Sequence, residues 1–421
     1  MNKENKTYFP NIDNIKVAAD TIKKVSAVTP LSHSLRYSKQ YQANIFFKRE
    51  DLQQVRSYKI RGAYNKISSL TKEQSAIGVV CASAGNHAQG VALSCKLLKI
   101  KGTIFMPAPT PNQKVEQVKM FGEDFIDIKL VGDTFDDAYH AATFECEALQ
   151  KTFIHPFNDE KVIEGQATIG LEILEQTDVP IDYVFLAVGG GGLAAGLSTV
   201  FKTLSPNTKI IGVEPEGAPS MTVSIKNNKN TELIHIEKFI DGAAVKRVGD
   251  LTFAICKETL SDMITVPEGK VCETILELYN KDAIVVEPAG ALSISVLDFY
   301  QDVIKGKNVI CIVSGSNNDI TRTAEIKERA LLYANLKHYF IINFPQRAGA
   351  LREFVVDILG KNDDITYFQY AKKTNRENGS AVVGIELKSV KDLEPLITKM
   401  KQRNFYGDYL NDKPDLFQFL V

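Results

Sequence analysis

The chain has 421 residues, and 50 Lys and Arg residues against 51 Asp and Glu residues leave a formal net charge of -1. Hydrophobic residues make up 44% of it and charged residues 24%, a composition typical of a globular protein of about two or three domains rather than of a disordered chain. The balanced charge argues against a nucleic-acid partner, and no run approaches the ~20 apolar residues that would span a membrane.

The N-terminus and the cysteines indicate where the protein works. Residues 1–6 (MNKENK) carry both charge signs and are not followed by the apolar core of a signal peptide. The cysteines form no C-x-x-C pair, and the histidines show no H-E-x-x-H spacing. We therefore expect a reduced, cytoplasmic protein without a disulfide framework or a transition-metal site.

From residue 44 to about residue 313, short apolar runs alternate with longer helical patterns, which is typical of an α/β protein with parallel sheets. The clearest strands are expected at residues 76–81, 101–106, 183–188, 209–213 and 308–313. Apolar side chains are not confined to alternate positions in these runs, so both faces of the strands should be buried.

The pattern changes after about residue 329. Strands are expected at residues 337–344, 364–370, 380–387 and 416–420, helices at 349–360 and 388–404, and turns at 345–348 and 375–379. The order β-α-β-β-α-β is that of a ferredoxin-like α+β unit, which can bury its own core. We therefore expect a first domain over residues 1–328 and a second over residues 337–421, with the boundary near residues 325–337.

Lys59 stands in residues 57–63 (SYKIRGA), at the start of a helical pattern. A lone lysine in such a place is usually a solvated surface residue. Beside the positive end of a helix, however, its pKa would be lowered, and it could act as a Schiff-base nucleophile. Neighbouring motifs must decide between the two interpretations.

The loop at residues 83–90 (SAGNHAQG) follows an expected strand and opens a helix. Small residues at such a turn leave backbone N–H groups uncovered, and the helix N-terminus attracts an anion such as a carboxylate. The alternative is a tight turn in which Asn86 caps the helix.

Gly189, Gly190, Gly191 and Gly192, followed by Leu193, again stand between a strand and a helix. Each glycine costs roughly 1 kcal/mol of backbone entropy relative to alanine, so phosphate binding explains the run better than a simple loop does. The run lacks the G-x-G-x-x-G of a dinucleotide site and the Lys-Ser/Thr of a P-loop.

Residues 287–291 (EPAGA) and 314–317 (SGSN) are ordinary turn sequences when taken alone. Together with the three motifs above, in this order, they resemble the fold type II pyridoxal-phosphate enzymes, the tryptophan-synthase-β-like family. Arg61 and the N-H-A-Q-G ending resemble those of threonine ammonia-lyases (threonine dehydratases) and their serine dehydratase and serine racemase relatives. The resemblance covers about residues 20–325. It implies two parallel-sheet α/β subdomains, the smaller (about residues 56–150) inserted in the larger.

The resemblance also implies a role for each motif. Lys59 would bind pyridoxal 5'-phosphate and take the Cα proton of the substrate, and Ser83 would be a second catalytic acid-base group. The other implied cofactor-binding residues are Asn86 at the 3-hydroxyl, Gly189, Gly190, Gly191, Gly192 and Leu193 at the phosphate, and Ser314 at the pyridine nitrogen. The implied substrate-binding residues, at the carboxylate, are Ser83, Ala84, Gly85, Asn86 and His87.

A neutral serine at the pyridine nitrogen makes the cofactor a weaker electron sink than an aspartate would, which favours rapid expulsion of a β-hydroxyl. The resemblance therefore implies dehydration of L-threonine to 2-oxobutanoate and ammonia, the first step of isoleucine biosynthesis. A dehydratase or racemase acting on L-serine is the alternative on the same scaffold. A non-catalytic amino-acid sensor is the alternative of another class, and the intact Lys59 and phosphate loop argue against it.

The second domain resembles, in single copy, the ACT-like regulatory domain of the biosynthetic threonine ammonia-lyases. Its topology and residues 344–351 (FPQRAGAL) carry this resemblance. It implies an allosteric amino-acid effector such as isoleucine, bound at the loop after Phe344, and the alternative is a purely oligomerising module. The family also implies a homotetramer.

Residues 212–220 (GVEPEGAPS) resemble the cation-binding loop of some serine racemases and dehydratases through Glu214, Ala218 and Ser220. Oxygen ligands of this kind suit a hard cation. The family often has an acidic residue at the place of Ser220, so we expect no metal here and interpret the loop as structural.

Overall fold

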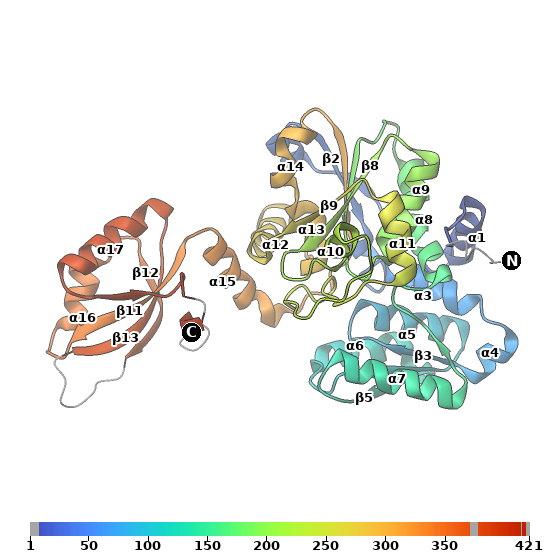
Figure 1. The fold of residues 1–421 in the computed structure, drawn as a ribbon, viewed down its shortest axis with the longest axis horizontal. Coiled ribbons are helices and arrows are strands. Elements are labelled where there is room, and N and C mark those ends of the chain that lie inside the picture. Colours follow the sequence, from blue (N-terminus) through green and yellow to red (C-terminus); the bar gives the residue numbers. More distant parts are fainter. Residues whose placement is uncertain (1–7, 371–377, 414, 418–421) are drawn as a thin grey trace. The chain divides into compact units, whose positions relative to one another are not determined.

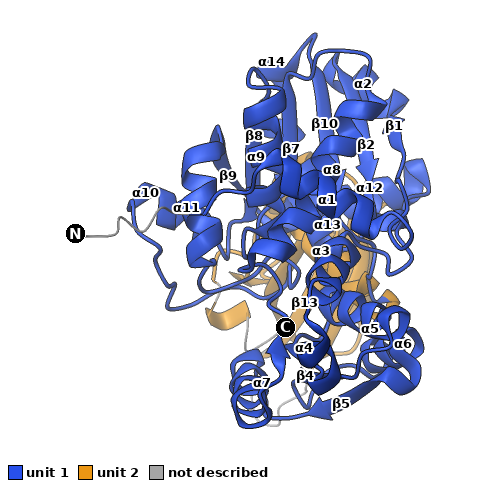
Figure 2. Cartoon of the chain, turned by 90° about the vertical axis from the view of Figure 1, so that its right-hand side faces the viewer, with its two compact units in different colours: residues 1–319 blue, residues 320–421 orange. Residues whose placement is uncertain are grey.

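The computed structural model describes residues 8–370, 378–413 and 415–417. It divides into two compact units, residues 1–319 and residues 320–421, coloured separately in Figure 2. The sequence indicates a boundary near residues 325–337, whereas the structure assigns helix α15 (Thr323–Tyr333) to the second unit, because α15 packs against strand β11 (Lys337–Pro345). Within the described ranges, no helix is long and apolar enough to cross a membrane.

The larger sheet of the first unit consists of β1 (Leu31–His33), β2 (Asn44–Arg49), β7 (Tyr183–Ala187), β8 (Lys209–Pro215), β9 (Asp262–Val266) and β10 (Asn308–Val313). Its order is β1-β2-β10-β7-β8-β9, with only β1 antiparallel to its neighbour. One side carries α8 (Glu160–Gln176), α9 (Gly192–Leu204) and α11 (Asp250–Thr259), and the other carries α12 (Glu268–Asp282), α13 (Pro288–Ser295) and α14 (Leu297–Ile304) (Figure 1). Helices on both sides explain why β10 is apolar and buried from Val309 to Val313.

Three further helices complete the periphery of this sheet: α1 (Ile12–Ile22), α2 (Leu35–Tyr41) and α10 (Ser220–Lys226). Helix α1 packs on α8, and α8 packs closely on α9. Gly196 permits that close approach, since a Cβ there would lie 2.6 Å from the carbonyl oxygen of Ile163.

The smaller sheet consists of parallel strands β3 (Val79–Ala82), β4 (Gly102–Met106), β5 (Ile126–Leu130) and β6 (Thr152–Phe153), in the order β5-β4-β3-β6. One face packs on α3 (Lys59–Ser68), α5 (Asn86–Leu98) and α6 (Asn112–Gly122), and the other on α7 (Phe135–Leu149). The strand predicted from residue 76 begins only at Val79. Residues 76–77 end helix α4 (Lys72–Ile77), and Gly78, at φ +98°, turns the chain into the strand.

The second unit has an antiparallel sheet in the order β12-β13-β11-β14, built from β11, β12 (Asp364–Tyr370), β13 (Asn378–Glu386) and β14 (Tyr406–Tyr409). Its core joins one face of this sheet to α16 (Ala350–Glu353), the π-helical turn Phe354–Ile358 that follows, and α17 (Leu393–Gln402). The structure thus confirms the expected fold class, an α/β domain with two parallel sheets and a ferredoxin-like α+β domain.

The predicted last strand, residues 416–420, is wrong at residues 416–417, which are helical. Among the described residues the last strand is β14, and residues 418–420 lie outside them, as do residues 375–377 of a predicted turn. The sequence shows no strand pattern at β14, because the strand contains Gly407 and Asp408 and both residue types are depleted in strands.

Candidate active site

The motifs of the first unit meet at the carboxyl ends of parallel strands. The loop at residues 83–87 follows β3, the glycine run follows β7 and Ser314 follows β10. The amide of Tyr58 donates to the carbonyl of Ser314 over 3.2 Å, so the segment that carries Lys59 lies beside the end of β10. The motifs thus lie at the carboxyl edges of both parallel sheets, where open α/β folds bind their ligands.

Lys59 is the first residue of α3 and is half-buried. Its Nζ donates to the carbonyl oxygen of Pro156 over 2.9 Å. Burial lowers the pKa of Lys59 to about 8, although the carboxylate of Glu287 opposes the shift. Removal of the amine from water is thus the main cause of the lowered pKa. An amine with such a pKa is partly neutral near pH 7, and the neutral form is the nucleophile.

The side-chain amide of Asn86 is held on both sides. Its Nδ2 donates to Glu287 Oε1 over 2.6 Å, and its Oδ1 accepts from Asn317 Nδ2 over 2.7 Å. These two contacts fix the orientation of the amide and leave one Nδ2 hydrogen for a ligand. The alternative that Asn86 caps the helix is wrong, because Gly85 is the N-cap residue of α5.

Glu287 and Asn317 are site residues to which the sequence gave no role, although each stands in a motif. Glu287 is 7% exposed. Burial, together with Asp241, raises the pKa of Glu287 to about 7, and the hydrogen bond from Asn86 acts in the opposite direction. No sequence pattern could have paired Glu287 with Asn86, because 201 positions separate them.

The substrate loop predicted at residues 83–87 forms a tight turn. Ser83 Oγ accepts from the amide of Gly85 over 3.3 Å, and Ala84 is half-buried. Burial lowers the pKa of His87 to about 3, with a further contribution from the charge of Lys59, so the imidazole is neutral. His87 Nε2 lies 2.8 Å from the carbonyl oxygen of Ile154 and therefore carries the proton. Because the Nε2 proton is used in this contact, the backbone N–H of His87 is the group that can bind a carboxylate.

The glycine run at residues 189–192 leads into α9. Gly191, at φ +90°, is the N-cap residue of this helix, and Leu193 in its first turn is 2% exposed. A Cβ on Gly190 would overlap the ring of Phe157. The first N–H groups of a helix have no partner within it, and the helix dipole favours an anion beside them. The run therefore has the geometry of a phosphate cradle.

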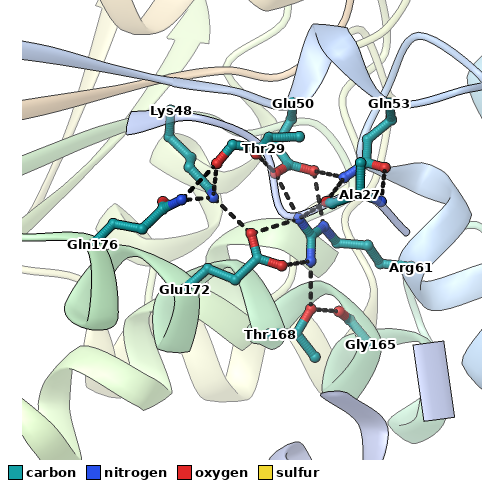
Figure 3. Close-up of polar contacts among 10 residues, drawn as sticks. All are labelled: Ala27, Thr29, Lys48, Glu50, Gln53, Arg61, Gly165, Thr168, Glu172 and Gln176. Carbon is teal, nitrogen blue, oxygen red and sulfur yellow. Dashed lines mark hydrogen bonds and ion pairs between the residues drawn. The ribbon is translucent and has the colours of Figure 1, made fainter. Parts of the chain in front are cut away.

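Arg61 anchors the helix that carries Lys59 (Figure 3). Its fully buried guanidinium pairs with Glu50 at 2.8 Å and with Glu172 at 2.5 Å. Lys48, also fully buried, donates to Glu172 over 2.6 Å and to the carbonyl of Thr29 over 2.7 Å. This network of two cations and two anions joins α3 to β2, to the 3-10 helix Glu50–Leu52 and to α8.

In the segment that resembles a cation loop, the side-chain oxygens of Glu214 and Ser220 form hydrogen bonds within the protein. The carboxylate of Glu214 accepts from the backbone N–H groups of Met221 and Thr222, at 2.7 and 2.8 Å. The Ser220 hydroxyl donates to a backbone carbonyl, and Ala218 lies buried in the preceding turn. Within the part of the chain that the structure describes, no group of three or more His, Cys, Asp or Glu side chains is arranged to hold a metal.

The site as a whole fits a cofactor that has both an aldehyde and a phosphate. A lysine amine with a lowered pKa can bind the aldehyde, the N-terminus of α9 can bind the phosphate, and the oriented Asn86 can donate to a ring hydroxyl. Ser314, 3% exposed at the end of β10, offers a neutral hydroxyl nearby.

Two family models match this chain, one in each of its two units. The model of pyridoxal-phosphate dependent enzymes matches residues 22–315, and that of the C-terminal regulatory domain of threonine dehydratase matches residues 328–420.

Individual relatives agree with these matches. Two proteins named biosynthetic L-threonine dehydratase IlvA align over 410 residues. The one from Halalkalibacterium halodurans is 53% identical and aligns over 97% of this chain and 99% of its own, and the one from Bacillus subtilis is 55% identical, with 97% of each chain aligned. The solved structure of the processed form of threonine deaminase isoform 2 from Solanum lycopersicum has a TM-score of 0.72 at 40% identity. The match covers 77% of this chain and 96% of the chain in that structure.

Proposed function

Because this chain belongs to the pyridoxal-phosphate-dependent threonine dehydratases, we propose that Lys59 is the lysine that binds its cofactor and carries out its proton transfer. The enzyme dehydrates and deaminates L-threonine to 2-oxobutanoate and ammonia, the first step of isoleucine biosynthesis, and its cofactor is pyridoxal 5'-phosphate. The comparisons do not favour the serine-directed and sensor alternatives.

One observation carries the proposal for Lys59: its amine lies at the candidate site with a pKa lowered by burial to about 8. The bound cofactor supplies the electron sink that makes the Cα proton of the substrate acidic. Lys59 Nζ takes that proton, because an amine with a pKa near the working pH can both accept and release one.

The other residues bind and orient. The N–H groups at residues 189–193 hold the phosphate, the free Nδ2 hydrogen of Asn86 meets the 3-hydroxyl, and Ser314 faces the pyridine nitrogen. The loop at residues 83–87 holds the substrate carboxylate, and Ser83 places a hydroxyl beside the substrate. The oriented amide of Asn86 and the N-cap geometry at Gly191 support these assignments.

The C-terminal unit is a regulatory domain, and we propose that it binds isoleucine at the loop after Phe344. In this loop Gln346 Nε2 is buried, and it has no hydrogen-bond partner among the described residues, which supports a polar ligand there. We also propose a homotetramer in the cytoplasm. None of the six cysteines, all of which the structure describes, forms a disulfide, which suits a reducing compartment. Light scattering on the purified enzyme measures the subunit number.

The test is release of 2-oxo acids from threonine and from serine, with and without isoleucine, by the cofactor-loaded enzyme and by Lys59→Ala. We expect more 2-oxobutanoate than pyruvate, a lower rate with isoleucine, and almost no product from the variant. Pyruvate as the main product would contradict the threonine assignment, and turnover by Lys59→Ala near that of the parent would contradict the role of Lys59.

A further inference from the structure

The segment at residues 154–158, here called the connector, joins β6 to α8 and touches several parts of the site. The carbonyl of Pro156 accepts from Lys59 Nζ over 2.9 Å, and the carbonyl of Ile154 lies 2.8 Å from His87 Nε2. The ring of Phe157 lies against Gly190 of the glycine run. The conformation of the connector therefore sets the position of the acceptor that holds the Lys59 amine.

His155 closes the turn of the connector. Its Nδ1 accepts from the backbone N–H groups of Phe157, at 3.2 Å, and Asn158, at 2.8 Å. Its ring meets the ring of Phe157 edge-on, with centroids 4.6 Å apart. Pro156, between them, has no N–H, so its carbonyl is the one polar backbone group that it can offer. The direction of this carbonyl depends on the turn.

The imidazole of His155 is suited to this task because it is neutral. Burial lowers the pKa of His155 to about 4, and the charge of Lys59 acts in the same direction while Asp159 opposes it. A neutral ring that accepts at Nδ1 carries its proton on Nε2. Nδ1 thus remains an acceptor for both amides throughout the neutral pH range.

We propose that His155 is a positioning residue: its Nδ1 closes the turn that holds the Pro156 carbonyl against the Lys59 amine, and so keeps this amine in place whenever it is free. The amine is free before the cofactor is attached and again once the substrate has displaced it. The inference therefore rests on the proposed role of Lys59. Misplaced reacting groups slow a reaction strongly even when binding is intact. Loss of the His155 acceptor should therefore lower kcat and the rate of cofactor attachment.

The test compares His155→Leu with His155→Asn. The leucine variant has no acceptor, whereas the side-chain oxygen of asparagine is attached to Cγ, as Nδ1 is, and can restore it. We expect His155→Leu to lower kcat for threonine about tenfold, to change KM less than about threefold, and to slow cofactor uptake by the cofactor-free protein about tenfold. The visible absorption of the lysine-bound cofactor measures that uptake. His155→Asn should recover most of both rates.

One control variant and one replacement variant separate this inference from general damage to the protein. His338, a buried histidine of the second unit, bonds to Tyr409 Oη at 2.8 Å and to the carbonyl of Asn335 at 3.0 Å, and His338→Leu should leave both rates unchanged. If His155→Leu does not fold, His155→Gln replaces it. Its acceptor lies one carbon farther out, and both rates should fall as predicted for leucine.

Three results would overturn the inference: parental rates in His155→Leu, parental rates in His155→Gln where it replaces leucine, or equal losses in a folded His155→Asn. Lys59→Ala, measured alongside, identifies which claim has failed. An inactive Lys59→Ala with a normal His155→Leu rejects only the role of His155. An active Lys59→Ala rejects the proposed role of Lys59 as well.

Discussion

At the scale of single residues, the hydrogen bonds of Asn86 decide which group it presents to a ligand. Asn317 donates to its oxygen, and Glu287 accepts from its nitrogen. The remaining Nδ2 hydrogen makes Asn86 a donor at the place where the cofactor hydroxyl is proposed to bind. Glu287 and Asn317 therefore act through Asn86 and are positioning residues.

Asn317→Asp tests this orientation. A carboxylate cannot donate to Asn86 Oδ1, so the contact that fixes the amide is lost and the remaining Nδ2 hydrogen is no longer held toward the cofactor hydroxyl. We expect cofactor affinity to fall about tenfold, the loss of roughly one hydrogen bond, as measured by equilibrium dialysis. Asn227→Asp, at an exposed position, is the matched control. Unchanged affinity in Asn317→Asp would refute the orienting role.

Glu214 gives stability a predictable pH dependence. Burial raises the pKa of Glu214 from 4.5 to about 7, so the folded protein holds this proton more tightly than the unfolded chain does. The contribution of Glu214 to stability is therefore greatest below its unfolded pKa and decreases as pH rises to its folded value. Glu214→Gln removes this dependence. We expect the free energy of unfolding of the parent, relative to the variant, to fall between about pH 4.5 and about pH 7 in denaturant titrations, and a constant difference would contradict the shift.

At the scale of elements, α3 is the critical helix because it carries Lys59 and packs against both α5 and α8. A Cβ on Gly165 of α8 would lie 2.6 Å from the carbonyl oxygen of Arg61, so the two helices cross in close contact. The buried charges around Arg61 fix this crossing. Burial would raise the pKa of Glu50, but the charge and hydrogen bonds of Arg61 bring it below the usual value.

Glu50→Gln should therefore destabilise the first unit strongly. It leaves the buried guanidinium of Arg61 with one carboxylate fewer, and breaking a buried ion pair costs about 3–5 kcal/mol. Chemical denaturation measures this loss. Glu116→Gln, which removes an exposed pair with Lys119, should cost no more than about 1 kcal/mol. Equal losses in the two variants would show that the network does not stabilise the fold.

The sequence could predict elements and loops better than the contacts between them. Strand β10 was predicted with its observed bounds, because a strand covered on both faces is a continuous apolar run. The strand β14, with its Gly and Asp, has no such pattern. The connector was missed for a related reason: Pro156 and Ile154 act through backbone carbonyls, which leave no mark in a sequence.

At the scale of the whole molecule, the two units have separate cores. In the first unit, clusters of buried apolar side chains pack on the two parallel sheets, and a separate cluster forms the core of the second unit. The residues proposed for catalysis all belong to the first unit, whereas the regulatory family match begins at residue 328. Catalysis and regulation should therefore be separable.

A chain that ends at Asp319 tests this separation. We expect it to release 2-oxobutanoate from threonine at a rate comparable to that of the full chain and to lose its response to isoleucine. Cutting after residue 319 removes α15 with the unit to which it belongs. Inhibition of the shortened enzyme at the same isoleucine concentrations would place the effector site in the first unit.

The most direct test of the central claim identifies the residue to which the cofactor is attached. Borohydride reduction of the loaded enzyme fixes the cofactor to its lysine, and peptide mass spectrometry then locates the added mass. We expect the added mass on Lys59 and on no other residue. Labelling of another lysine instead, or a fully loaded enzyme with Lys59 unmodified, would contradict it.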